Sequence, residues 1–344
     1  MALCLPVDIA ALENYIATHV PVIQTPITLS QFGYGQSNPT YQIAAFNGAR
    51  YVMRKKPPGR LVSKSAHKVE REYRTLNALE QTEFPVPRVF CLSVDEGVID
   101  TPFYIMEYLD GRIYEDPTFP GVSAEERTAL WREAMVTLAK LHRVDPGSIG
   151  LAETWRNLTT AQGAVLDKET MEPVGPVPGV EDMIKFFSFP RYKPKDRASL
   201  VHGDFKIDNL VYHKTEPRII GILDWEMSTI GHPLADIANV VHPWTLSLPH
   251  SKDGTEGLPS IPQCLAWHAS EAGWHPAPAP DLRWAEAFCL FRLSIIYQGI
   301  AARYAARQAS STQAKERGRA MYPSAELAMR VIRDITSQSD VARL

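Results

Sequence analysis

The sequence has no excess of positive charge and no long apolar run. Its 36 Lys and Arg residues are outnumbered by 39 Asp and Glu residues, giving a net charge of −3. Without a general basic field we expect no nucleic-acid partner. No stretch approaches the roughly 18 apolar residues that a membrane-spanning helix needs, so no membrane span is expected.

Cysteine is scarce, and two common sequence signals are absent. The four cysteines are too widely spaced for a zinc knuckle or a redox pair, which favours free thiols in a reducing compartment. Residues 1–11 lack the basic start of a secretory signal, so a cytoplasmic protein is expected. The last residues, Ala342-Arg343-Leu344, have the small–basic–leucine character of a peroxisomal address, although an ordinary chain end would look the same. No G-x-x-x-x-G-K-[ST] sequence exists, which excludes a Walker-type phosphate loop.

The first third of the chain has the pattern of a small antiparallel sheet. Alternating residues and turn signals, including Asn47-Gly48, predict strands separated by short loops, and helical spacing predicts one charged helix. The expected strands cover 29–32, 41–44, 50–54, 89–94 and 103–107, and the expected helix covers 66–80.

The rest of the chain is mostly helical. Ser123 and Glu126 form a capping box ahead of a helix that reaches His142, and helical composition returns from about residue 282. Three short strands are expected at 200–202, 209–212 and 218–223, and residues 152–195 suggest a loop-rich segment around one short helix. These patterns predict two lobes, 1–108 and 109–344, joined at about 106–111.

Two segments carry the residue types of phosphoryl transfer. They are His202-Gly203-Asp204-Phe205-Lys206-Ile207-Asp208-Asn209 and Ile222-Leu223-Asp224-Trp225-Glu226. A first carboxylate, Asp204, can orient or deprotonate an attacking hydroxyl. Asn209 and Asp224 supply hard oxygen ligands that suit Mg²⁺ on nucleotide phosphates.

Other roles for these residues are less consistent with the pattern. A hydrolytic metal site built from His202, Asp204, Asp208 and His213 is disfavoured, because alternation and a turn place these side chains on different faces. His202, at a strand end, is expected to be a structural residue that accepts or donates hydrogen bonds. Asp236 is expected to hold the catalytic loop by hydrogen bonds.

The complete pattern resembles the aminoglycoside phosphotransferase and choline kinase superfamily. H-G-D-x-x-x-x-N, a hydrophobic-Asp-Trp-Glu segment and Gly231-His232-Pro233-Leu234-Ala235-Asp236 all match that superfamily. The spacing also mirrors protein kinases, with Gly203 in place of their arginine and Trp225-Glu226 in place of Phe-Gly. The resemblance implies an α+β, protein kinase-like two-lobed fold and a dependence on ATP and Mg²⁺.

The nucleotide is expected to bind to the first lobe. Gly35, Ser37 and Asn38 lie in a glycine-rich loop whose N–H groups and hydroxyl suit phosphate. By resemblance, a strand cation held by Glu72 on the helix contacts the α- and β-phosphates. Arg54 is preferred for this role, with Lys55 as the alternative. The main chain of Glu107 and Tyr108 resembles the hinge that pairs with adenine.

The acceptor is less defined than the reaction. Residues 303–344 hold eight Lys and Arg against four Asp and Glu, which argues against a polycationic aminoglycoside and favours an anionic acceptor, or else a solvated helix face. The chain most resembles kinase-like domains associated with acyl-CoA dehydrogenases, which suggests a hydroxyl on a small metabolite of the hydroxyacyl-CoA kind. Residues 150–168 depart from that pattern, so a nucleotide-binding scaffold without turnover is the alternative.

Overall fold

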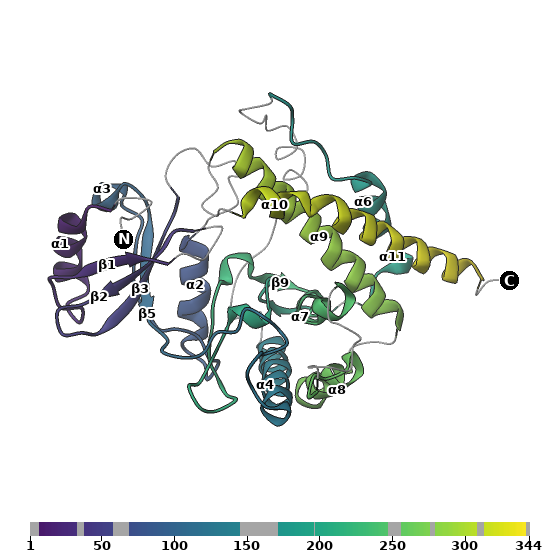
Figure 1. Cartoon of the computed structure of the whole chain (residues 1–344), viewed down its shortest axis with the longest axis horizontal. Coiled ribbons are helices and arrows are strands. Elements are labelled where there is room, and N and C mark those ends of the chain that lie inside the picture. The colour runs from purple at the N-terminus through teal and green to yellow at the C-terminus, as the bar shows by residue number, and fades with distance from the viewer. Residues whose placement is uncertain are drawn as a thin grey trace.

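The computed structural model describes residues 7–32, 38–57, 69–144, 171–195, 197–246, 256–275, 279–307 and 313–341. A small sheet with its own helices lies at one end of the molecule, and the long C-terminal helices lie at the other (Figure 1). The predicted residues Gly35 and Ser37 and the C-terminal Ala342-Arg343-Leu344 lie outside the described residues, as does the departing segment 150–168.

The N-terminal sheet has five antiparallel strands in the order β1-β2-β3-β5-β4. The sequence of three strands, a helix and two strands agrees with the prediction, and the boundaries agree to within one residue for the strands. The strands are β1 (Thr28–Gln31), β2 (Thr40–Ala44), β3 (Arg50–Lys55), β4 (Val89–Ser93) and β5 (Phe103–Glu107).

Helices cover both faces of this sheet. Val52 and Tyr104 pack with the residues of α2 (Val69–Leu79), whereas Tyr51 and Met53 pack with those of α1 (Ile9–His19). The prediction included α2 but missed α1 and the short α3 (Glu96–Ile99). A strand covered on both faces shows no polar–apolar alternation, which explains why five consecutive residues of β3 are buried.

The second part of the chain is mainly helical, with two small two-stranded sheets. Glu126 N–H donates to Ser123 Oγ at 3.2 Å, as the predicted capping box requires. Strand β6 (Ser199–Val201) pairs with β9 (Thr229–Gly231), and β7 (Leu210–Tyr212) pairs with β8 (Ile219–Ile222). The helices are α4 (Ala124–Arg143), α6 (Val180–Ser188), α7 (Leu234–Leu246), α8 (Ile261–Ala272), α9 (Ala279–Ala305), α10 (Ala314–Arg319) and α11 (Met321–Val341), with single turns η2 (Pro190–Tyr192), η3 (Ile207–Asn209) and η4 (Trp225–Met227).

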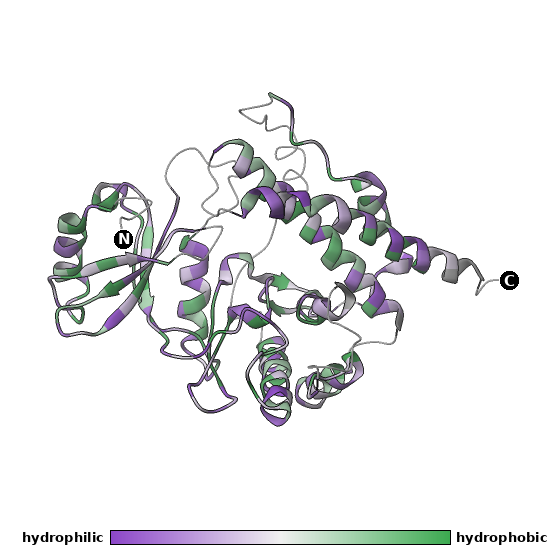
Figure 2. Ribbon diagram, viewed as in Figure 1, coloured by the Kyte–Doolittle hydropathy of each residue, from purple (hydrophilic) through white to green (hydrophobic). Residues whose placement is uncertain are grey.

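One apolar core joins the two parts. It contains Val52 and Tyr104 from the sheet, Leu76 from α2, and Trp131 and Trp225 from the helical part. The helices carry both apolar and polar stretches, as expected of elements with one face in a core (Figure 2). The predicted lobe boundary at residue 108 follows the end of β5 by one residue and stays a prediction.

Helix α9 is long and apolar enough, by length and composition, to cross a membrane. Its segment Pro280–Ala305 has a mean hydropathy of 1.2, and 61% of that window is buried inside the protein. It packs against α7, α10 and α11, which is the environment of a central core helix. The buried Arg292 within it donates to the carbonyl of Gly203, a contact that lies inside the protein.

Candidate active site

The catalytic loop begins where β6 ends, at His202 and Gly203. Gly203 has a φ of +83°, and a Cβ built there would lie 2.4 Å from the carbonyl oxygen of Met227. Both the backbone angle and the lack of space require glycine. The arginine that protein kinases carry at this position therefore has no room here, and the chain turns directly into Asp204.

His202 holds the loop and takes no part in a proton relay with Asp204. Its Nδ1 accepts from the Asp204 N–H at 3.1 Å, so its Nε2 carries the proton and donates to the Leu223 carbonyl at 3.0 Å. Burial lowers the pKa of His202, which keeps the ring neutral. Asp236 accepts from the N–H groups of His202 at 2.7 Å and Gly203 at 2.9 Å. These contacts give both residues the structural roles expected of them.

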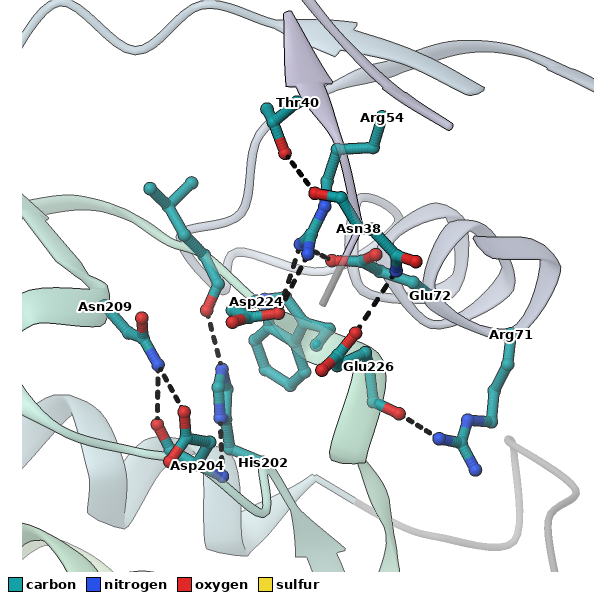
Figure 3. Close-up of polar contacts among 12 residues, drawn as sticks. Asn38, Thr40, Arg54, Arg71, Glu72, His202, Asp204, Asn209, Asp224 and Glu226 are labelled. Carbon is teal, nitrogen blue, oxygen red and sulfur yellow. Dashed lines mark hydrogen bonds and ion pairs between the residues drawn. The ribbon is translucent and has the colours of Figure 1, made fainter. Parts of the chain in front are cut away.

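Asp204 and Asn209 lie side by side in the loop (Figure 3). The Asn209 amide donates to a carboxylate oxygen of Asp204 at 3.1 Å and to its main-chain carbonyl at 2.8 Å. Because the amide nitrogen is used this way, the amide oxygen of Asn209 is turned away from Asp204. Burial raises the pKa of Asp204, and Lys206, whose Nζ lies 3.5 Å from its carboxylate, opposes that shift.

Asp224 lies two residues after the end of β8, in the left-handed region at φ 68°. The Leu223 N–H donates to the Asn209 carbonyl at 2.9 Å, which places Asp224 next to the catalytic loop. Burial alone would raise the pKa of Asp224, but Arg54 and Lys206 outweigh burial and hold it below its usual value. Asp224 is therefore an ionised carboxylate at neutral pH, which suits the predicted role of an oxygen ligand.

Arg54 of β3 joins Asp224 to α2. Its guanidinium lies 2.5 Å from Glu72 Oε1 and 3.1 Å from Asp224 Oδ1 (Figure 3). Burial would lower the pKa of Arg54, yet the two carboxylates raise it well above its ordinary value. Lys55 lies on the opposite face of the sheet, 6.0 Å from the ring centre of Tyr41. Because neighbouring side chains of β3 point to opposite faces of the sheet, Arg54 faces Glu72 and Asp224 whereas Lys55 faces away from them.

Asn38 and Arg71 bring two further elements to the same site. Asn38, just before β2, donates to Glu226 Oε2 at 3.1 Å, and Arg71 of α2 donates to the Glu226 carbonyl. Arg71, Glu226 and Lys206 were absent from the predicted site. The sequence offered one indication of them, which is that they lie close to Glu72, Asp224 and Asp204 along the chain. Proximity in sequence alone does not distinguish a functional residue from a solvated one.

The predicted hinge residues lie at the end of β5. Glu107 pairs with Tyr51 of β3, and its carboxylate accepts from the Arg88 N–H at 3.2 Å. The Tyr108 ring lies 4.1 Å from the guanidinium carbon of Arg50. Their role toward adenine stays a prediction.

The residues of the alternative metal site are used elsewhere. Asp208 lies 3.2 Å from the Lys206 ammonium, and His213 lies 3.7 Å from Glu216. Within the described part of the chain no group of three or more His, Cys, Asp or Glu could hold a metal ion. Such a group would not be required for Mg²⁺ carried by a nucleotide, which takes one or two protein carboxylates and completes its shell with phosphate and water. The carboxylate of Asp224 and the free amide oxygen of Asn209 fit that ion.

Comparison with known proteins agrees with this geometry. The phosphotransferase enzyme family, as a sequence model, matches residues 28–254. The chain belongs to the phosphotransferase enzyme family. The match covers every site residue described above, from Asn38 to Asp236, so the loop of Asp204 and Asn209, Asp224 and the Arg54–Glu72 pair all lie within the family region.

The relatives of this phosphotransferase are longer proteins. It is 40% identical over 332 residues to an Arabidopsis thaliana protein named as an acyl-CoA dehydrogenase, IBR3, covering 88% of this chain and 40% of the relative. Acyl-CoA dehydrogenase family member 11 of Rattus norvegicus is 34% identical over 352 residues, covering 97% of this chain and 45% of the relative. The chain thus spans less than half the length of these relatives.

Solved structures show the same fold. A Ralstonia eutropha protein named as an aminoglycoside phosphotransferase superposes with a TM-score of 0.73 at 33% identity, covering 96% of this chain and 99% of the other. Choline kinase LicA of Streptococcus pneumoniae gives 0.62 at 12% identity, over 94% and 98% of the two chains. These matches confirm the predicted α+β, kinase-like fold. The chain is a small-molecule phosphotransferase of the kinase type.

Proposed function

We propose that the protein transfers the γ-phosphate of ATP, with Mg²⁺, to a hydroxyl of a small anionic metabolite. One observation carries the proposal: the strand cation Arg54 contacts both Glu72 and Asp224, and Asp224 adjoins the loop of Asp204 and Asn209. This arrangement brings a phosphate-binding cation, oxygen ligands and a carboxylate base to one place. Phosphoryl transfer requires that set of groups.

Each residue of the site has a separate role in the proposed reaction. Arg54, held by Glu72, binds the phosphates of ATP, and Asn38, which follows the glycine-rich segment in the sequence, donates to Glu226. Asp204 orients the acceptor hydroxyl and takes its proton, and Lys206 beside it balances negative charge. Asp224 and Asn209 would hold Mg²⁺, which neutralises developing phosphate charge when bound. A relative, APH(4)-Ia, has been crystallised with the ATP analogue AMP-PNP, which supports ATP as the donor.

An anionic acceptor fits the charges beyond the loop. Burial lowers the pKa of Arg303 on α9, and the charge of the Glu226 carboxylate opposes that shift. Basic residues exceed acidic ones two to one from residue 303 onward. Together with relatives named as acyl-CoA dehydrogenases, this favours a hydroxyacyl-CoA-like metabolite over an aminoglycoside.

The proposal is tested by Mg-ATP titration calorimetry followed by a phosphorylation screen of hydroxylated acids and their CoA thioesters. Asp204→Asn is the matched control, because it keeps the shape of the side chain and removes the base. We expect ATP binding in both proteins, and turnover lower by about 10²–10⁴-fold in the variant.

Two outcomes would count against the proposal. If the wild-type protein binds no nucleotide, both catalysis and the scaffold alternative fail. If it binds Mg-ATP but phosphorylates nothing beyond the level of Asp204→Asn, the nucleotide-binding scaffold replaces the enzyme.

A further inference from the structure

Arg292 is a buried cation on the central helix α9, outside the residues assigned to phosphoryl transfer. It is 5% exposed, and although its charge opposes the burial that raises the pKa of the nearby Asp204, it forms no ion pair with a carboxylate among the described residues. Taking an arginine out of water without a counter-ion costs several kcal/mol as an order of magnitude. A buried arginine therefore needs hydrogen-bond acceptors that compensate its charge. The identity of these acceptors indicates which part of the protein the arginine holds in place.

The acceptors of Arg292 belong to the catalytic loop and to a residue that binds the loop. Its Nη1 donates to the carbonyl of Gly203, and its Nη2 donates to Asn239 Oδ1 at 2.7 Å. Because Oδ1 of Asn239 accepts from the arginine, the amide nitrogen of Asn239 faces the other way. That nitrogen donates to the Phe205 carbonyl at 2.9 Å.

The two carbonyls fixed in this way lie on either side of Asp204. The carbonyl of Gly203 is bound directly by Arg292, and that of Phe205 is bound through Asn239. The carbonyl of Asp204 itself accepts from Asn209 at 2.8 Å. Three successive peptide groups therefore have their oxygen atoms fixed from three different elements, α9, η3 and α7.

We infer that Arg292 is a positioning residue, which acts with Asn239 to fix the peptide groups before and after Asp204 and so aims its carboxylate at the acceptor. The inference rests on the proposed function, because it assigns Asp204 the role of base. Arginine suits this task better than lysine, since its planar fork reaches two acceptors at once whereas an ammonium is a single point charge. An error of about 1 Å in a reacting group costs roughly 100-fold in rate.

The test uses the full chain with Arg292→Gln, Arg292→Lys and the control Arg283→Gln. Arg283 lies on the same helix and is more exposed, where it pairs with Glu286 and Asp334. For Arg292→Gln we expect turnover about 100-fold lower and a Kd for Mg-ATP within about twofold of wild type, since the nucleotide cation Arg54 is untouched. Arg292→Lys should recover part of the loss, and Arg283→Gln should match wild type.

Hydrogen exchange of the amides of residues 202–204 provides a readout that needs no turnover. We expect these amides to exchange at least about 10-fold faster in Arg292→Gln than in wild type or Arg283→Gln. Unchanged exchange and turnover would overturn the inference. A Kd for Mg-ATP that weakens in step with turnover would also overturn it, because that result indicates a general structural role. If wild type binds and turns over no nucleotide, the proposed function fails, and the exchange result still decides whether Arg292 fixes the loop.

Asn239→Asp keeps the inference testable if Arg292→Gln does not fold. Aspartate retains the acceptor for Arg292 and adds a counter-ion to it, so folding is preserved, but it cannot donate to the Phe205 carbonyl. We expect turnover about 10-fold lower with an unchanged Kd for Mg-ATP, from a partial loss of orientation. Turnover equal to wild type would show that fixing Phe205 does not matter.

Discussion

The two sides of the site are held together in different ways. On the nucleotide side, Arg54, Glu72 and Asp224 contact one another through their own charged side chains. On the catalytic side, Asp204 is placed mainly through the main chain beside it, where Asp236 accepts from the N–H groups of His202 and Gly203 and Arg292 donates to the Gly203 carbonyl. The difference indicates that the geometry of the nucleotide side depends on the candidate functional residues themselves. The geometry of the catalytic side depends instead on the buried residues Asp236 and Arg292, which hold the loop.

The largest effect is expected from Arg54→Met. The change leaves Glu72 and Asp224 close together without their shared cation, and breaking a buried pair in this way costs about 3–5 kcal/mol. We expect the free energy of unfolding in urea to fall by that amount and Mg-ATP binding to be lost in calorimetry.

Lys55→Met is the matched control for Arg54→Met. Burial lowers the pKa of Lys55, and methionine has a similar length without the charge, so little change in stability or ATP affinity is expected. Equal losses in both variants would show that the two faces of β3 do not differ in function.

Asp236→Asn should separate the catalytic side from the nucleotide side. The amide that replaces one carboxylate oxygen meets an N–H donor, which leaves a buried donor unsatisfied at a cost of about 1–3 kcal/mol. We expect a fall in stability and in kcat, with the Kd for Mg-ATP within about twofold of wild type. A weakening of ATP affinity parallel to kcat would mean that the two sides are not independent.

The catalytic side should also respond to acid through two buried histidines of α4 and α8. His142 Nε2 lies 3.5 Å from Asp236, and His142 Nδ1 lies 2.9 Å from His268 Nε2. Burial lowers the pKa of His268 to about 3. In the unfolded chain His268 is therefore protonated below about pH 6.5, whereas in the folded protein it stays neutral down to about pH 3. The free energy of unfolding thus falls as the pH falls through this window.

His268→Gln removes that linkage. Between pH 6 and pH 4 we expect the slope of unfolding free energy against pH to decrease by about 1.4 kcal/mol per pH unit. His242, whose pKa burial lowers to about 4, contributes a similar slope that remains. Urea denaturation at several pH values checks this, with the exposed His19→Gln as control. An unchanged slope in His268→Gln would contradict the assignment.

The smallest effect is expected from Asn38→Ala. It removes one hydrogen bond to Glu226, worth about 1 kcal/mol. Asn38→Asp should cost more in urea denaturation, because it places two carboxylates against each other. The reverse order would show that the Asn38–Glu226 contact contributes nothing.

Sequence patterns predicted the elements that carry the candidate site better than those that only cover surfaces. The N-terminal strands, β7, β8 and α2 followed from alternation, turns and helical spacing, whereas β9, which pairs with β6, was missed. The spacing of Asp204, Asn209 and Asp224 at strand ends predicted that they lie together, which the contacts of Asn209 confirm, and their roles in the reaction stay predictions. Helix α1 was missed, since its role is to bury Leu12 and Ile16 against the sheet, and no functional spacing marks it. Arg292 could not be found, because the contact with Gly203 joins residues 89 positions apart.

Trp225, the residue after Asp224, has a consequence for inhibitor design. Its indole is fully buried, donates to the Ile222 carbonyl at 2.9 Å, and has its ring centroid 4.5 Å from that of His202. Removing so large a side chain from a core costs about 3–5 kcal/mol. An inactive form in which the Asp224 turn swings out would have to expose this indole. That cost keeps the Asp224 turn in place, so inhibitors that compete with the acceptor are a better starting point than compounds that need the turn displaced.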